Sequence, residues 1–358
     1  MAYIKERIER TMAANTPRVF TKTCLQTLAA MAASKVLWKI YKKVYLDDKD
    51  IELEHVDKLK AKGDGWRIFP YVRTGYRKVT PSCLFCVCSC GCGHNEICNV
   101  WTHFFASLYY YNSFKQHNPA WPSRWVALGG AGLFGASTLA HCTSCYSEFV
   151  EDIMFRIDRS SIAAYFTCFS IVAGYQHFGT RGEHELLRKF TIGTSLVGSA
   201  STLAVFFGAG MPKYAKFLTL ASVTSCIVVP VVREYLHSRG ASGKMKVALV
   251  LQHMPVSSFL GALGGVIFST GVPERFPGLA KKLGLPENMF DYFSSHSIMH
   301  IVVFVAAYWG YVGQTKWDAI LSEEAKLMRS NTAAKSLSRT MASVSMYINA
   351  LRNFKFSF

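Results

Sequence analysis

Seven apolar runs in the last three quarters of the chain limit its fold more than any other feature. They alternate with short polar breaks and cover residues 100–114, 125–146, 161–178, 190–211, 217–232, 247–272 and 289–312. A helix needs about 20 mostly apolar residues to cross a bilayer, so the first and fifth runs must draw on their flanks. The runs are rich in small residues, which favour close helix packing in lipid. The pattern predicts an all-α membrane protein with a bundle of seven transmembrane helices.

The composition supports this class and excludes others. Hydrophobic residues make up 50% of the 358 positions and charged residues only 18%, against about 25% charged in soluble domains. The net charge is +17, but no zinc-finger, helix-turn-helix or RNA-binding signature accompanies the basic residues. We therefore expect no nucleic-acid partner and attribute the positive charge to contact of loops and tails with anionic lipid.

The apolar runs divide the chain into three parts. Residues 1–98 form a polar N-terminal region with 17 Lys+Arg and 10 Asp+Glu, residues 99–313 form the bundle, and residues 314–358 form a C-terminal tail. The first ten residues are charged, so we expect no secretory signal peptide. The basic N-terminal region and the missing signal favour a cytoplasmic N-terminus, although the charges of the short loops do not decide the orientation.

Two further segments flank the bundle. Residues 24–46 mix apolar residues with lysines, which predicts either a basic amphipathic helix on the membrane surface or a plain soluble helix. Residues 332–351 form a weaker apolar stretch, and Lys335 and Arg339 within it argue against an eighth span.

Six of the eleven cysteines crowd one stretch before the first run. Their spacing does not match a zinc ribbon, because no second pair follows 15 to 20 residues on. Cysteines next to a span are often S-acylated, so palmitate is the first expectation here, with a metal cluster or disulfides as alternatives. The six are Cys83, Cys86, Cys88, Cys90, Cys92 and Cys98.

Histidines in the apolar runs are the strongest candidates for function, because ionisable residues inside a membrane are costly. His141 lies near the end of the second run, while His296 and His300 are four residues apart near the start of the seventh, hence on one helix face. The end of an even span and the start of an odd span lie on the same side of the membrane. Asp158, before the third run, and Ser137, one turn before His141, belong to that side as well.

This set of residues points to a metal site. Three histidines with one open position are typical of catalytic zinc, which activates water for hydrolysis. Asp158 would then hold that water or move its proton, and Ser137 would orient a ligand or polarise a carbonyl. The alternative is that each histidine caps a helix end or bonds to a neighbour. The remaining histidines of the bundle and its leading segment lack a spaced partner, and we interpret them as packing, loop or capping residues: His94, His103, His177, His184, His237 and His253.

Several motifs resemble one known family. Residues 94–103, HNEICNVWTH, resemble the HNExxNxWTH signature of the progestin and adipoQ receptor family, which includes haemolysin III-like proteins. Tyr71 and the segment GYR at residues 75–77 resemble its lead-in. Ser137, His141 and Asp158 resemble its second motif, while PERFP at residues 273–277 and SHSIMH at residues 295–300 resemble its last. The matches keep their order from about residue 71 to residue 320.

The resemblance implies seven spans, a cytoplasmic N-terminus and a zinc ion near the cytoplasmic face. His141, His296 and His300 are the implied ligands, and Asp158 and Ser137 the implied pair beside them. The sequence departs from the family pattern after Asp158, where RSSIA stands in place of a DYxGIA-like run, and at Ser297, which replaces a glutamine.

The family suggests two activities. Its adiponectin receptors are linked to ceramidase activity and its membrane progestin receptors to steroid response, and the segments NVWTH and QTKWDAI (residues 314–320) look closer to the progestin-receptor branch. We therefore expect a receptor for a steroid or other lipid-like ligand. A zinc-dependent lipid amide hydrolase, at the same site, is the first alternative. Zinc with a purely structural role is the second, less favoured because structural sites normally have four ligands. A receptor with an outside N-terminus is disfavoured by the resemblance.

Overall fold

The computed structural model describes the chain except for residues 1, 47–52, 64–65, 67, 117, 119, 209–220, 222–224, 238–239, 277 and 354–358. The described residues form helices joined by turns, and the one β-type pairing among them is an isolated bridge between Glu54 and Tyr76. The prediction of an all-α protein is therefore confirmed for this part of the chain.

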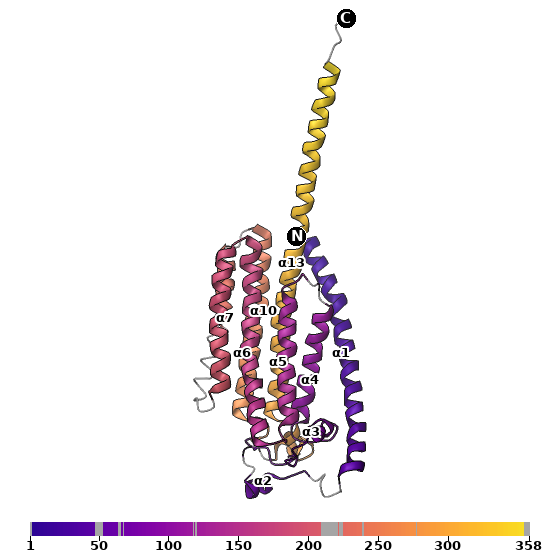
Figure 1. The fold of residues 1–358 in the computed structure, drawn as a ribbon, viewed down its shortest axis with the longest axis vertical. Coiled ribbons are helices and arrows are strands. Elements are labelled where there is room, and N and C mark those ends of the chain that lie inside the picture. Colours follow the sequence, from indigo (N-terminus) through magenta and orange to yellow (C-terminus); the bar gives the residue numbers. More distant parts are fainter. Residues whose placement is uncertain are drawn as a thin grey trace.

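Long helices stand side by side and form the bundle (Figure 1). Consecutive helices pack against one another from α4 to α7, and α10 packs against α13. Part of the predicted fifth run, residues 217–220 and 222–224, lies outside the described residues, and the last part of the run begins α9. The bundle elements are α4 (Ile97–Gln116), α5 (Ser123–Thr143), α6 (Glu148–Phe178), α7 (His184–Phe207), α9 (Val228–His237), α10 (Gly240–Thr270) and α13 (Ser295–Asn353).

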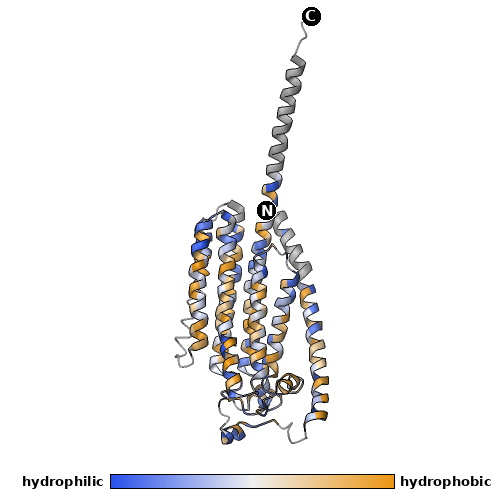
Figure 2. Cartoon of the chain, viewed as in Figure 1, coloured by the Kyte–Doolittle hydropathy of each residue, from blue (hydrophilic) through white to orange (hydrophobic). Residues whose placement is uncertain are grey.

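Three of these helices are long and apolar enough to cross a membrane, judged by length and composition over the described residues. They are α7, α10 from Gly243 onward, and α13 as far as Ser330. Apolar side chains point outward from them: Leu196 on α7 is 67% exposed and Phe259 on α10 is 66% exposed. Figure 2 shows hydrophobic residues along the bundle helices and a largely hydrophilic α2 (Val56–Lys62). Outward apolar faces of this extent are those of helices surrounded by lipid.

The core of the bundle is aromatic and closely packed. Tyr110 of α4 lies against Phe134 of α5, with ring centroids 5.6 Å apart. Gly130 allows this approach, because a Cβ atom there would lie 2.7 Å from the Tyr110 ring. On the same helix, Gly132 has open space around its Cα.

The N-terminal helix does not lie where a surface helix would. α1 (Ala2–Tyr45) includes the predicted helical segment, but it runs lengthwise beside α4 (Figure 1). The Asn112 side chain of α4 donates hydrogen bonds to Thr23 Oγ1 at 3.1 Å and Gln26 Oε1 at 2.6 Å. On α1 the polar residues Thr23 and Thr27 are buried, whereas Leu25 and Leu28 are more than 60% exposed. α1 therefore lies along the side of the bundle rather than across its end, with apolar residues turned away from it.

One end of the bundle carries the shorter elements. α2 and α3 (Cys83–Ser89) lie there (Figure 1). The chain segments that begin or end at that place include the end of α5 and the starts of α4, α6 and α13, so residues far apart in sequence meet there. At the opposite end, α13 shows no break at residue 313 and continues as one helix to Asn353.

Candidate metal centre

The three predicted histidines come together at the end of the bundle where α5 ends and α13 begins. One ring nitrogen from each of His141, His296 and His300 lies within 4.8 Å of the other two. The ring centroids are 4.7 to 4.9 Å apart. His141 and His300 are buried. The three rings thus lie together, as expected if successive helix ends alternate between the two ends of the bundle.

Each ring offers a buried nitrogen without a hydrogen-bond partner in the described part of the chain. These atoms are His141 Nε2, His296 Nδ1 and His300 Nδ1. Buried polar atoms normally have partners, so three such nitrogens in one cluster need an explanation. A metal ion bound by the imidazoles supplies one, and an all-imidazole donor set suits Zn²⁺ among other transition metals.

Glu96 orients the first of these rings. Its Oε2 lies 2.7 Å from His141 Nδ1. Burial opposes ionisation of Glu96, but the His141 ring and the hydrogen bonds from His141 and Asn99 outweigh it and hold the pKa of Glu96 at about 2. The carboxylate therefore accepts, Nδ1 carries the proton, and His141 Nε2 keeps its lone pair. This tautomer follows from the hydrogen bond, and it is the arrangement that carboxylates impose on metal-bound histidines.

A short hydrogen-bond chain continues from Glu96 to α13. Asn99 Nδ2 donates to Glu96 Oε2 at 2.7 Å, and Ser297 Oγ donates to Asn99 Oδ1 at 2.7 Å. Ser297, the residue that departs from the family pattern, lies between the two histidines of α13 and is fully buried. These hydrogen bonds thus fix the position of α4 relative to both histidines of α13.

His103 was interpreted as a packing residue, and the structure places it against the histidine cluster. Its ring stacks on His300, with centroids 3.6 Å apart and planes 8° apart. Both of its ring nitrogens are buried and without a hydrogen-bond partner among the described residues. It also contacts Phe134 edge-on at 4.9 Å. Its face therefore fixes the plane of the His300 ring.

Aromatic rings cover the cluster on its other sides. Phe155 of α6 meets His141 with centroids 5.0 Å apart, and Phe268 of α10 meets His296 at 4.9 Å. Phe69, in the segment before α3, meets His296 at 5.5 Å. Three elements thus shield the imidazoles from water, which strengthens electrostatic interactions at the site.

Asp158 and Ser137 lie beside His141, as the sequence predicted. Ser137 is buried on α5. Burial raises the pKa of the Asp158 carboxyl, while the His141 ring and the Ser137 hydroxyl next to it act in the opposite direction. Asp158, Ser137 and the His141 ring thus form one polar cluster. The Nδ1 atom of the same ring faces Glu96.

The GYR lead-in builds the wall of the site. Gly75 has a φ of +85°, and a Cβ atom there would lie 3.1 Å from Asn95 N, an atom that donates to the Gly75 carbonyl at 2.9 Å. Only glycine adopts this turn without strain. Arg77, two residues on, donates to the carbonyls of His141 and Cys142 at 2.8 and 3.0 Å. It satisfies carbonyl groups at the end of α5 and fixes the backbone of a histidine of the site.

The PERFP segment does the same for α13. Glu274 accepts a hydrogen bond from the backbone nitrogen of Ser295 at 2.7 Å, and the Ser295 hydroxyl also donates to this carboxylate. A carboxylate at a helix start satisfies a free N–H and interacts favourably with the helix dipole. The first turn of α13, with His296, is held in this way.

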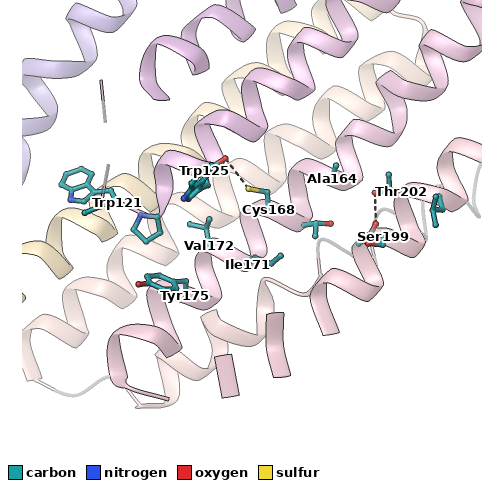
Figure 3. Close-up of a pocket in the computed structure, with 14 residues that line it drawn as sticks. Trp121, Trp125, Ala164, Cys168, Ile171, Val172, Tyr175, Ser199 and Thr202 are labelled. Atoms are coloured by element: carbon teal, nitrogen blue, oxygen red, sulfur yellow. Dashed lines mark hydrogen bonds between the residues drawn. The ribbon is translucent and has the colours of Figure 1, made fainter. Parts of the chain in front are cut away.

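One cavity lies away from the three histidines of the cluster. It has a volume of about 940 Å³ and opens between α5, α6 and α7 (Figure 3). Its lining includes Trp125 at the start of α5, Tyr175 near the end of α6 and Ser199 on α7. His141 lies in the last turn of α5 and Trp125 in its first, so the histidine cluster and the cavity lie toward opposite ends of this helix.

Comparison with known proteins adds independent information. A family model described as haemolysin-III related matches residues 93–311. The human membrane progestin receptor delta is 27% identical over 257 residues, 64% of this chain and 70% of that protein. An uncharacterized protein of Schizosaccharomyces pombe is 25% identical over 298 residues, 76% of this chain and 63% of its own length. The progestin and adipoQ receptor-like protein 1 of Caenorhabditis elegans is 24% identical over 258 residues, 68% of this chain and 56% of its own.

Proposed function

Because the chain belongs to the haemolysin-III-related family, we propose that it is a seven-span membrane receptor with a zinc ion on His141, His296 and His300. Its ligand is a steroid or another lipid-like molecule. The name of the human relative, a membrane progestin receptor, supports the receptor class. The observation that carries the zinc site is the trio of buried, unpartnered imidazole nitrogens together with the Glu96 hydrogen bond to His141.

The seven spans are the seven apolar runs, in α4, α5, α6, α7, the segment ending in α9, α10 and α13. Three of these helices meet the length and composition expected of a span. The others contain polar residues that the structure pairs inside the bundle. Gln176 of α6, for example, donates to Asp318 at 2.7 Å and to the Gln314 carbonyl at 3.1 Å. The basic N-terminal region favours a cytoplasmic N-terminus, with the zinc near that face.

The helices themselves support a receptor. α5 and α6 line the 940 Å³ cavity, and both also reach the metal cluster, through His141 and Asp158. The volume falls in the range of pockets that hold small molecules. A lipid-like ligand in this cavity therefore shifts helices that carry residues of the site, which is a direct physical route from ligand to metal centre.

Two measurements test the proposal. Metal analysis of the purified protein should give about one zinc per chain, lost in the His296→Ala/His300→Ala variant and kept in His237→Ala, whose histidine is exposed on α9. Binding of labelled progesterone should fall at least tenfold in Ser199→Phe, which fills the cavity. Leu196→Phe, on the exposed face of α7, should bind as the wild type does. Zinc-free wild-type protein would contradict the metal site, and equal binding in both α7 variants would contradict the cavity.

A second function is favoured by the position of Asp158 and Ser137. A zinc ion at the three histidines polarises a carbonyl and activates water. In this proposal the Asp158 carboxyl would accept the proton of the attacking water, and the Ser137 hydroxyl would donate a hydrogen bond to the substrate. Such residues would hydrolyse a lipid amide of the ceramide type. Hydrolysis and receptor function can share the site, because a hydrolytic product can itself be the signal.

A zinc ion with only a structural role is the third reading. It would tie α5 to α13 through the same three histidines. Structural zinc sites normally have four protein ligands, and three residues form the metal-binding group found among the described residues. This reading therefore ranks below the other two.

A further inference from the structure

Four buried cysteines form two facing pairs between α3 and the end of α5. Cys86 Sγ lies 3.7 Å from Cys145 Sγ, and Cys90 Sγ lies 3.5 Å from Cys142 Sγ. Their exposures are 0%, 2%, 7% and 7%. The pairs lie next to the metal cluster, because Cys142 follows His141, but they share no residue with it.

Helical spacing stacks the two pairs. Cys86 and Cys90 are one turn apart at α3, and Cys142 and Cys145 are about one turn apart at the end of α5, so each thiol of one segment meets one thiol of the other. The sulfurs of Cys90 and Cys142 both lie 3.4 Å from the Cys86 carbonyl oxygen. The four thiols therefore form two stacked pairs, Cys86 with Cys145 and Cys90 with Cys142.

Neighbouring groups hold the two segments in this register. Arg77 donates to Ser89 Oγ of α3 at 2.7 Å and to the Cys142 carbonyl of α5 at 3.0 Å. α1 closes the cluster from outside, since a Cβ atom at Gly91 would lie 2.2 Å from the Ser34 carbonyl oxygen. Contacts between the two backbone segments thus keep the thiols of each pair facing each other.

The alternatives for these cysteines fit less well. S-acylation places a fatty chain in lipid, and the four buried sulfurs have no such access, although Cys83 on the same short helix is exposed. A tetrahedral metal site needs its donor atoms mutually close. Among the described residues, the three histidines form such a group of three or more donors, and the cysteines do not.

We propose that Cys86–Cys145 and Cys90–Cys142 are a modification site at which hydrogen peroxide forms two reversible disulfide bonds. One thiol of a pair reduces the peroxide, releases one water and becomes a sulfenic acid. The facing thiol attacks that sulfur and displaces the second water. Two thiols and one peroxide thus yield one disulfide and two waters, and an added dithiol restores the thiols by exchange. The sulfurs need to approach by about 1.5 Å to reach disulfide distance.

The bonds tie the N-terminal region covalently to the helix that carries His141. The residues joined are 59 and 52 positions apart in the chain, so each bond closes a long loop and restricts the unfolded chain. This property goes beyond receptor or hydrolase function and does not depend on a bound metal. Failure of the zinc proposal would leave it intact.

Peptide mapping of the full chain in detergent tests the proposal. After peroxide treatment and alkylation of the remaining thiols, both predicted disulfides should be found, and dithiothreitol should restore four alkylatable cysteines. The Cys90–Cys142 disulfide should form first, because these two side chains are more exposed than those of Cys86 and Cys145. Oxidation should also raise the midpoint of thermal unfolding.

Single variants sharpen the result. Cys142→Ser should lose one disulfide and keep Cys86–Cys145, whereas the matched control Cys83→Ser should keep both. Crossed pairs, such as Cys86–Cys142, would overturn the proposal. So would four unreacted thiols in folded protein, or a second metal ion per chain that Cys86→Ser/Cys90→Ser removes.

Discussion

The Glu96 carboxylate and the Nδ1 atom of His141 lie 2.7 Å apart, although 45 residues separate them in the chain. Glu96 precedes α4 and His141 ends α5, so the hydrogen bond closes the site between two helices of the bundle. It leaves His141 Nε2 as the nitrogen available to a metal ion. In the proposed zinc site, Glu96 would therefore position a ligand without binding the metal itself.

Glu96→Gln should lower zinc affinity about 10- to 100-fold. The amide keeps the size of the side chain but removes the charge that fixes the His141 proton on Nδ1. Competition against a chelator of known affinity measures the effect. Glu148→Gln, an exposed glutamate at the start of α6, serves as control and should bind zinc normally. Unchanged affinity in Glu96→Gln would remove Glu96 from the site.

Asp158→Asn separates hydrolysis from metal binding. If the site hydrolyses lipid amides, turnover of a fluorescent ceramide should fall about 100-fold or more, because the amide cannot accept a proton. Zinc content should stay at the wild-type value. Asp152→Asn changes a carboxylate of the same helix that pairs with Arg156, and it should retain turnover. The hydrolase alternative fails if Asp158→Asn turns over ceramide at the wild-type rate.

Gly130→Ala should destabilise the bundle by about 1–3 kcal/mol. The new methyl group would lie 2.7 Å from the Tyr110 ring, which is fully buried and has little room to move. Gly132→Ala is a close control, since it is on the same helix with nothing within 4 Å, and it should be neutral or slightly stabilising. Thermal unfolding in detergent compares the two. Equal effects would show that the α4–α5 contact is looser than described.

The carboxyl of Glu151 should make stability depend on pH. Burial raises its pKa to about 7, so the folded state holds this proton more tightly than the unfolded state does. The free energy of unfolding should then decrease as pH rises from about 4.5 through 7. The contribution is about 1–2 kcal/mol after allowance for solvent screening of this partly exposed group.

Glu151→Gln should remove that part of the pH dependence and should be more stable than the wild type at pH 8. Chemical unfolding at pH 5, 6.5 and 8 measures both. Glu148→Gln, three residues earlier, provides the comparison. A parallel pH profile in wild type and Glu151→Gln would refute the assignment.

The histidine cluster could be anticipated from the sequence because it follows from two simple rules. His296 and His300 share a helix face by their spacing, and His141 joins them because alternate helix ends return to the same side. Neither rule needs the details of side-chain packing. The same rules placed Asp158 and Ser137 near that side.

Residues that act through long-range contacts could not be found in this way. The partner of His103 is 197 residues away on α13, so no local spacing marks the stacked pair. Glu96 stands in an irregular segment, where hydrophobic periodicity gives no orientation. Its burial depends on the turn at Gly75, which brings the segment against α5 and α13.

The N-terminal helix shows a different limit. Its apolar and basic residues predicted a helix over residues 24–46, and α1 covers that segment as far as Tyr45. The sequence pattern cannot decide whether such a helix lies on a lipid surface or packs against a helix bundle. The contacts of Asn112 with Thr23 and Gln26 decide between them, and they involve polar residues that a hydrophobic pattern ignores.

The uninterrupted helix α13 connects the histidine cluster with a distant point of the molecule. The helix that begins beside His296 and His300 extends to Asn353, about 80 Å from His300 at 1.5 Å per residue. A tilt of about 5° at the histidines displaces the far end by about 7 Å over this length. Were α13 to move as a rigid rod, a small change of angle at His296 and His300 would thus displace its far end by several ångströms.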